Sequence, residues 1–127
     1  MIISIGIDII EIRRVSEALM RTPRLGERVF TEEERAYCDS RGAASAQHYA
    51  ARFAAKEAAF KALRTGWRDG LSWHHVEVTS TDAGAPALQL GGHARTLFDA
   101  MGCTHAHLSL SHTSEHAVAQ VIFERRT

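Results

Sequence analysis

The stretch SIGIDIIEI, residues 4–12, places one acidic side chain, Asp8, inside a run of isoleucines. Strict alternation over residues 2–10 predicts a buried β-strand, in which four isoleucines share one face: Ile3, Ile5, Ile7 and Ile9. Asp8 falls on the other face, together with Ser4 and Gly6. A buried carboxylate is costly unless it is paired with a cation or bound to a metal. The rest of the sequence must therefore supply a partner for Asp8.

Length and composition indicate one domain that spans residues 1–127. The 15 basic and 15 acidic side chains cancel, so no overall charge points to nucleic acid or a membrane as a partner. Cys38 and Cys103 stand far apart, which argues against a disulfide framework or a thiolate zinc site. Without an apolar run of transmembrane length or a signal-peptide pattern, we expect a cytoplasmic protein.

The remaining patterns predict an α+β fold, in which an antiparallel sheet packs against one long helix and several shorter ones. A helical stretch after the first strand is broken near Pro23, and Thr31 and Glu34 have the spacing of a capping box. The longest helical pattern covers residues 45–64, with Gly66 just beyond its end. Further strands are expected at 75–81, 86–90, 105–112 and 117–124, and a short helix at 94–102.

A second acid, Glu57, lies on the long helix at the edge of its apolar stripe. Lys61 follows one turn later, and Arg64 lies on the same side of the helix. One carboxylate with two cations suits a metal and a phosphate, and hard oxygen ligands in small number suit Mg²⁺. Two simpler interpretations stay open: Glu57 and Lys61 form an ordinary surface pair, and Asp8 makes only local hydrogen bonds.

Histidines and arginines provide other candidate sites. Four of the eight histidines lie near the last two strands, but there is no HExxH motif and no convincing third ligand, so zinc binding is a weaker alternative. His112 shares a strand face with Leu108 and Leu110, which also fits a histidine at the edge of the core. The segment after the first strand carries an excess of arginine, which indicates either a docking surface for an acidic protein or a solvated helix face.

Three blocks of sequence also resemble one enzyme family. GIDIIEIRRV, RFAAKEAAFKAL and LSLSHTSEHAVAQVI occur in this order and, with FTEEERAYC between the first two, extend the resemblance from Ile3 to about Arg125. They are similar to the holo-[acyl-carrier-protein] synthases, the small single-domain 4'-phosphopantetheinyl transferases. The resemblance implies magnesium-dependent transfer of the 4'-phosphopantetheine arm of coenzyme A to a serine of apo acyl carrier protein. Adenosine 3',5'-bisphosphate would be released, and the reaction would serve fatty acid biosynthesis.

The same resemblance implies roles for individual residues. Asp8 and Glu57 match the magnesium ligands, and Lys61 matches a lysine that contacts phosphate, which makes these three the catalytic set. Coenzyme A would be bound by Lys61, His112 and Thr113. Arg64 and Gly66 are further candidates for this binding, because of their position at the end of the long helix. The family typically forms homotrimers, in which His112 and Thr113 reach coenzyme A across a subunit boundary. The first helix would dock the acidic carrier protein through Arg13, Arg14, Arg21 and Arg24.

Two other classes of function remain as alternatives. A module that only binds coenzyme A or a nucleotide would show no magnesium-dependent transfer, and the paired acids Asp8 and Glu57 argue against it. A histidine–zinc protein would keep stoichiometric zinc through dialysis.

Overall fold

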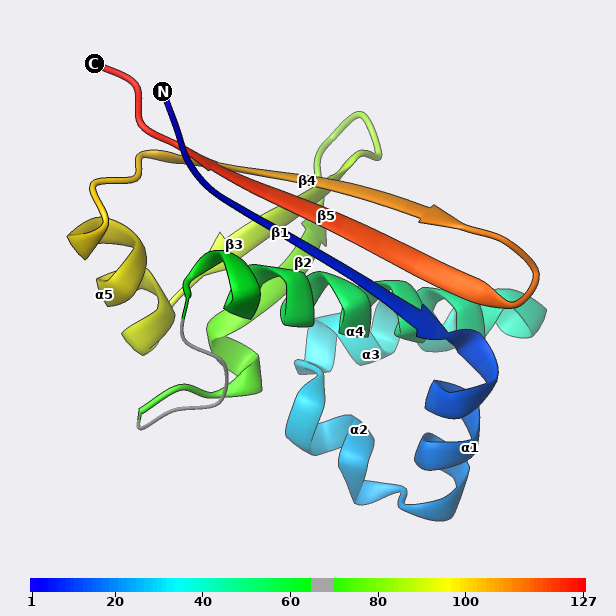
Figure 1. The fold of residues 1–127 in the computed structure, drawn as a ribbon. Helices are drawn as coiled ribbons and strands as arrows, with labels where there is room; N and C mark the ends of the chain where they lie inside the picture. The colour runs from blue at the N-terminus through cyan, green and yellow to red at the C-terminus, as the bar shows by residue number, and fades with distance from the viewer. Residues whose placement is uncertain (65–69) are drawn as a thin grey trace.

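The structure, a computed structural model, describes residues 1–64 and 70–127 (Figure 1). It confirms the predicted α+β class, with antiparallel sheets and one long helix. Its elements, in chain order, are β1 (Ile2–Glu11), α1 (Ile12–Arg21), α2 (Arg24–Val29), α3 (Glu32–Asp39), η1 (Gly42–Ala44), α4 (Ser45–Ala62), η2 (Trp73–His75), β2 (Val76–Ser80), β3 (Pro86–Leu90), α5 (Gly92–Ala100), β4 (His105–His112) and β5 (His116–Glu124).

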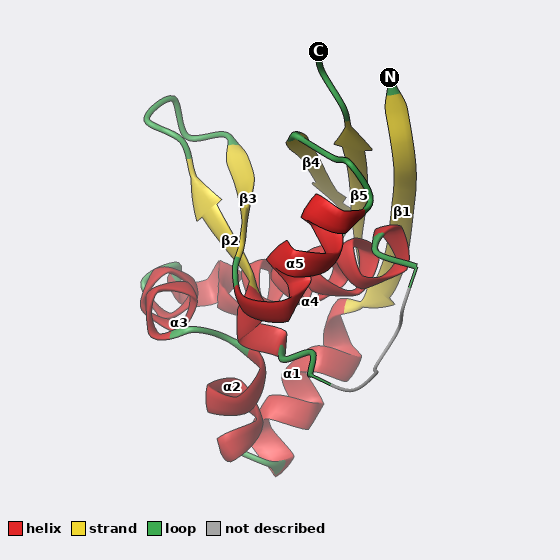
Figure 2. Cartoon of the chain, turned by 90° about the vertical axis from the view of Figure 1, so that its left-hand side faces the viewer, coloured by secondary structure: helices red, strands yellow, loops and turns green. Residues whose placement is uncertain are grey.

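The strands form two antiparallel sheets. One has the order β1-β5-β4, and the other is the β2-β3 hairpin (Figure 2). In the three-stranded sheet Asp8 of β1 stands opposite Ala119 of β5. Helix α4 packs across one face of this sheet, where alternate residues of β5 are fully buried: Ala117, Ala119, Val121 and Phe123. In the three-stranded sheet β5 is the central strand, and β1 and β4 are the two edge strands.

Helix α4 is buried over most of its surface, and small side chains make this possible. The helix contributes a set of alanines with no exposed surface, Ala50, Ala54, Ala55, Ala58, Ala59 and Ala62. The predicted start at Ser45 is confirmed, but the helix ends at Ala62, two residues before the predicted end. Arg64 adopts the left-handed conformation, with φ 61°, that usually terminates a helix. Gly66, the predicted terminating residue, lies outside the described residues.

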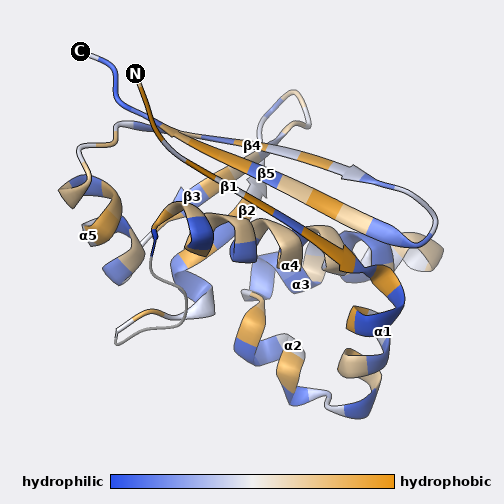
Figure 3. Ribbon diagram, in the orientation of Figure 1, coloured by the Kyte–Doolittle hydropathy of each residue, from blue (hydrophilic) through white to orange (hydrophobic). Residues whose placement is uncertain are grey.

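The prediction of β1 as a buried strand was wrong for its isoleucine face. Ile5, Ile7 and Ile9 are 54%, 57% and 63% exposed, whereas Ser4 and Gly6 on the opposite face are buried against α4. Figure 3 shows that hydrophobic residues make up most of β1. Contiguous apolar surface of this kind typically marks a protein interaction site.

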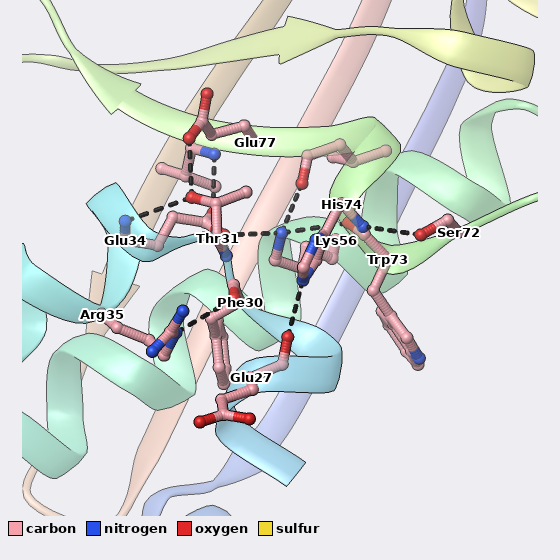
Figure 4. A network of polar contacts seen from close by, with 12 residues as sticks. Glu27, Phe30, Thr31, Glu34, Arg35, Lys56, Ser72, Trp73, His74 and Glu77 are labelled. Atoms are coloured by element: carbon pink, nitrogen blue, oxygen red, sulfur yellow. Dashed lines mark hydrogen bonds and ion pairs between the residues drawn. The ribbon is translucent and has the colours of Figure 1, made fainter. Parts of the chain in front are cut away.

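A buried ion pair connects α3, α4 and the start of β2 (Figure 4). The Lys56 ammonium lies 2.8 Å from the Glu34 carboxylate, and both side chains are completely buried. Lys56 also donates to the carbonyls of Trp73 and Val76. Glu34 accepts hydrogen bonds from the backbone N–H groups of Thr31 and Val78, the first of which belongs to the predicted capping box. Each partner thus has its charge and its hydrogen-bonding capacity satisfied, as a buried pair requires.

Two smaller findings concern predicted absences. Cys38 and Cys103 are both buried and unpaired, in agreement with the expectation of no disulfide. No helix in the described part of the chain has the length and apolar character needed to cross a membrane.

Candidate functional site

Asp8 receives its compensating charge from α4. The Lys61 ammonium lies 3.0 Å from Asp8 Oδ1 and also donates to the carbonyl of Ile7, 3.0 Å away. The Asp8 side chain is 17% exposed and that of Lys61 is 54% exposed, so the pair opens to solvent on one side. Lys61 therefore makes its ion pair and its backbone hydrogen bond with β1. This differs from the alternative in which Lys61 forms only a surface pair with Glu57 on the same helix.

Glu57 faces the same place from α4. Partial burial raises the pKa of the Glu57 carboxyl, the negative charge of Asp8 raises it further, and Lys61 opposes both effects. The influence of Asp8 on this pKa means that the two carboxylates are close enough to repel each other. The structure therefore brings together the three predicted catalytic residues, Asp8, Glu57 and Lys61.

The chemistry of this donor set fits magnesium. Two carboxylates that repel each other would be stabilised by a divalent cation, and their oxygen atoms are the ligands that magnesium prefers. Among the described residues no group of three or more histidine, cysteine or acidic side chains is arranged to hold a metal. Magnesium tolerates such an incomplete protein shell because it usually keeps waters and binds substrate phosphates. The same finding gives no support to the zinc alternative.

Arg64 lies beside the same strand, just beyond the end of α4. Its Nη2 donates to the carbonyl of Ile3 at 2.8 Å, and the residue is exposed. The end of a helix carries partial negative charge, which disfavours phosphate. Lys61 and Arg64 supply positive charge at this end of α4.

His112 and Thr113 lie elsewhere, at the end of β4. Because β5 stands between β1 and β4, they are on the opposite edge of the sheet from Asp8. Exposed His112 borders a cavity of about 110 Å³, which is also lined by His48 and Arg52 of α4. Thr113 Oγ1 accepts hydrogen bonds from the backbone N–H groups of Glu115 and His116. Within one chain, these residues do not join the site formed by Asp8 and Glu57.

The four predicted docking arginines share one region of the surface. Three of them lie on α1 and the fourth begins α2, and all are exposed: Arg13, Arg14, Arg21 and Arg24. Arg13 is paired with Glu17 at 2.7 Å on the surface of α1. Arg14 stands at the rim of an apolar cavity of about 160 Å³ between α1, α2 and α4, lined in part by Leu19, Leu25 and Phe53.

Sequence reasoning missed two buried cations of α4, Lys56 and Arg52. The side chain of Lys56 is completely buried, and Arg52, 5% exposed, lies over the ring of Tyr37 at 4.2 Å. A signal was present for Lys56, because it interrupts a run of alanines where a solvated side chain would be out of place. Its partner Glu34 was predicted only as a capping residue, and no local pattern joins residues 34 and 56.

Comparison with known proteins identifies the family of the chain. A sequence profile described as the 4'-phosphopantetheinyl transferase superfamily matches residues 4–121. The chain therefore belongs to the 4'-phosphopantetheinyl transferase superfamily. Within it, the relatives are enzymes named holo-[acyl-carrier-protein] synthase. The one from Geobacter metallireducens is 50% identical over 126 residues, and the match covers 98% of this chain and 99% of the relative. The one from Koribacter versatilis is 44% identical, with 98% and 99% covered.

Solved structures lead to the same family. The holo-[acyl-carrier-protein] synthase of Neisseria meningitidis matches with a TM-score of 0.88 and 28% identity, over 98% of this chain and 100% of that one. The synthase of Bacillus anthracis, in a complex with CoA (3',5'-ADP), matches with a TM-score of 0.81 and 38% identity over 99% of both chains. The resemblance seen in the three sequence blocks is thus confirmed, and the chain is an enzyme of this family.

Proposed function

We propose that this enzyme transfers the 4'-phosphopantetheine arm of coenzyme A to a serine of apo acyl carrier protein. The serine oxygen would form a bond to the pyrophosphate phosphorus that bears the pantetheine. The bond from that phosphorus to the bridging oxygen would break, and adenosine 3',5'-bisphosphate would leave with the electron pair. The serine proton would pass to solvent. The names of the relatives and the coenzyme A complex of the Bacillus anthracis synthase support the two substrates.

The observation that carries the proposal is the convergence of Asp8, Glu57 and Lys61 at the crossing of β1 and α4. Two carboxylates and one ammonium, partly open to solvent, suit a metal and a pyrophosphate together. In the proposed site Asp8 and Glu57 would hold Mg²⁺. Bound there, Mg²⁺ would neutralise charge on the pyrophosphate and favour departure of the bisphosphate.

The cations of the chain would orient the substrate. Lys61 has a half-exposed side chain, so its ammonium can contact a phosphate oxygen while it stays near Asp8. Arg64 adds a second charge at the same end of α4, where the helix itself disfavours anions. The proposed contribution of Gly66 falls outside the described residues.

A homotrimer would complete the site. In the proposed trimer, the His112 and Thr113 that contact coenzyme A would come from a neighbouring subunit, because those of the same chain lie at the opposite edge of the sheet from Asp8. The exposed isoleucines of β1 offer apolar surface for such an interface. The recess beside His112 also contains Arg52, whose charge suits a phosphate group.

The carrier protein would dock on α1 and α2. The arginines Arg13, Arg14, Arg21 and Arg24 suit an acidic partner, whose encounter they would accelerate. We propose fatty acid biosynthesis as the pathway served and the cytoplasm as the location. The two buried, unpaired cysteines are compatible with a reducing compartment.

The direct experiment is intact mass spectrometry of apo acyl carrier protein after incubation with coenzyme A, Mg²⁺ and the enzyme. We expect the mass to rise by one phosphopantetheine group, and only when magnesium is present. An unchanged mass, with a known synthase active on the same carrier, would contradict the proposal.

A further inference from the structure

Strand β1 crosses α4 at a distance that only glycine permits. A Cβ atom placed on Gly6 would lie 1.9 Å from the carbonyl oxygen of Ala58, 2.9 Å from its carbonyl carbon and 3.0 Å from the Ala62 nitrogen. All three are backbone atoms of α4, so no side chain can rotate away to make room. The two backbones would have to separate by at least about 1 Å before such a contact became tolerable.

Hydrogen bonds hold the strand at this crossing. Ser4, which is 8% exposed, donates from its Oγ to the carbonyl of Ala62 at 2.6 Å. That carbonyl belongs to the last turn of α4, where no intrahelical N–H is available for it. Arg64 and Lys61 donate to the carbonyls of Ile3 and Ile7, on either side of Gly6. The strand is thus tied to the end of the helix at several successive residues.

The crossing determines where the two acids stand. Glu57 directly precedes Ala58 in α4, and Asp8 is two residues, about 7 Å, beyond Gly6 along β1. The contact between Gly6 and Ala58 therefore sets how far apart the backbones that carry Asp8 and Glu57 lie. Magnesium accepts oxygen ligands at about 2.0–2.1 Å and tolerates departures of only about 0.2 Å. A displacement of 1 Å exceeds that tolerance several times.

We propose that Gly6 and Ser4 are positioning residues, which set the separation of Asp8 and Glu57 and thereby the affinity of the site for the metal. The inference rests on the proposed function, because it assumes that these two acids bind Mg²⁺. Both residues are buried against α4, so their effect would pass through the backbone spacing between β1 and α4.

The test measures Mn²⁺ binding to the purified enzyme by electron paramagnetic resonance, without substrates. We expect Gly6→Ala to raise the Mn²⁺ dissociation constant by about tenfold or more, and to raise the Mg²⁺ concentration needed for half-maximal transfer. The KM for the carrier protein should not change. The matched control is Gly26→Ala in α2, where an added Cβ meets only side-chain atoms at 3.7 and 3.9 Å. That variant should bind Mn²⁺ as the unaltered enzyme does.

Further variants distinguish an error in the proposed metal site from an error in the proposed role of Gly6. If Asp8→Asn binds Mn²⁺ as tightly as the unaltered enzyme, the assignment of the metal site is wrong and this inference falls with it. If Asp8→Asn loses Mn²⁺ but Gly6→Ala keeps it, only the inference about Gly6 is overturned. Should Gly6→Ala fail to fold, Ser4→Ala decides the matter, because it removes one tether and adds no atoms. We expect severalfold weaker Mn²⁺ binding with an unchanged circular dichroism spectrum, and unchanged binding would overturn the inference.

Discussion

Two lysines of α4, Lys56 and Lys61, should respond differently to replacement with methionine. Lys56 is completely buried against Glu34 and has two further carbonyl partners. Lys61 is half exposed beside Asp8 at the candidate site. Replacing either with methionine keeps the length of the side chain and removes its charge. We expect Lys56→Met to cost stability and Lys61→Met to cost activity.

The magnitudes follow from burial. Removal of one partner from a buried ion pair leaves an uncompensated charge, which typically costs about 3–5 kcal/mol. For a chain of this length, such a loss lowers Tm by roughly 10–20 °C. The partly exposed Lys61–Asp8 pair should contribute no more than about 1 kcal/mol to folding. Lys61→Met should nevertheless reduce turnover strongly, because the ammonium would no longer contact a substrate phosphate.

The assay is urea unfolding followed by circular dichroism at one fixed protein concentration, with turnover measured on the same samples. A loss below about 1 kcal/mol in Lys56→Met, or an equal loss in Lys61→Met, would refute the reasoning.

Three further outcomes are expected. Arg14→Glu should raise the KM for carrier protein, most strongly at low salt, whereas the control Arg95→Glu on α5 should leave this KM unchanged. If both variants have the same KM, the arginines of α1 are only solvated surface residues. Glu57→Gln and His112→Ala, each inactive alone, should regain activity when mixed after subunit exchange, and a verified exchange without activity would contradict a shared site. Burial and the charge of Asp8 raise the pKa of Glu57 in the folded state. The carboxyl of Glu57 therefore stabilises the fold at pH values below its pKa in the unfolded chain, and this stabilisation is lost as the pH rises. In chelator-treated samples at pH 8, the Tm of Glu57→Gln should therefore equal or exceed that of the unaltered enzyme. Thermal melts should show that this difference disappears near pH 4.

Most of the fold could be predicted from local patterns. The alternation around Asp8, the break at Pro23 and the capping box of Thr31 depend on neighbouring residues, and the corresponding elements are present. The environment of β1 could not be predicted in this way, because alternation defines two faces and does not say which one is buried. Gly6 and Ser4 provide the reason: the small residues face α4, so the isoleucines must face outward.

The residues of the candidate site could also be predicted only in part from local patterns. Asp8 was recognisable because a strand interior disfavours aspartate, and Glu57 because of its place at the edge of an apolar stripe. Their convergence depends on how β1 crosses α4, which no local pattern encodes. The Lys56–Glu34 pair was missed for the same reason, since its partners come from separate helices. The separation of His112 from Asp8 also became evident only from the order of the strands.

The central claim is that Asp8 and Glu57 act together as the metal-binding part of a transfer site. The most direct test compares Asp8→Asn and Glu57→Gln with the unaltered enzyme, with turnover and Tm measured on the same samples with and without Mg²⁺. The account predicts that each variant keeps its fold and loses turnover by about 100-fold or more, with partial recovery at high Mg²⁺. Without magnesium, Tm should be unchanged or higher in Glu57→Gln, because a carboxylate of a repelling pair has been removed. In Asp8→Asn it should stay within a few degrees, because the loss of the ion pair with Lys61 opposes this gain. Near-normal turnover per folded molecule, together with a lower Tm, would contradict the account.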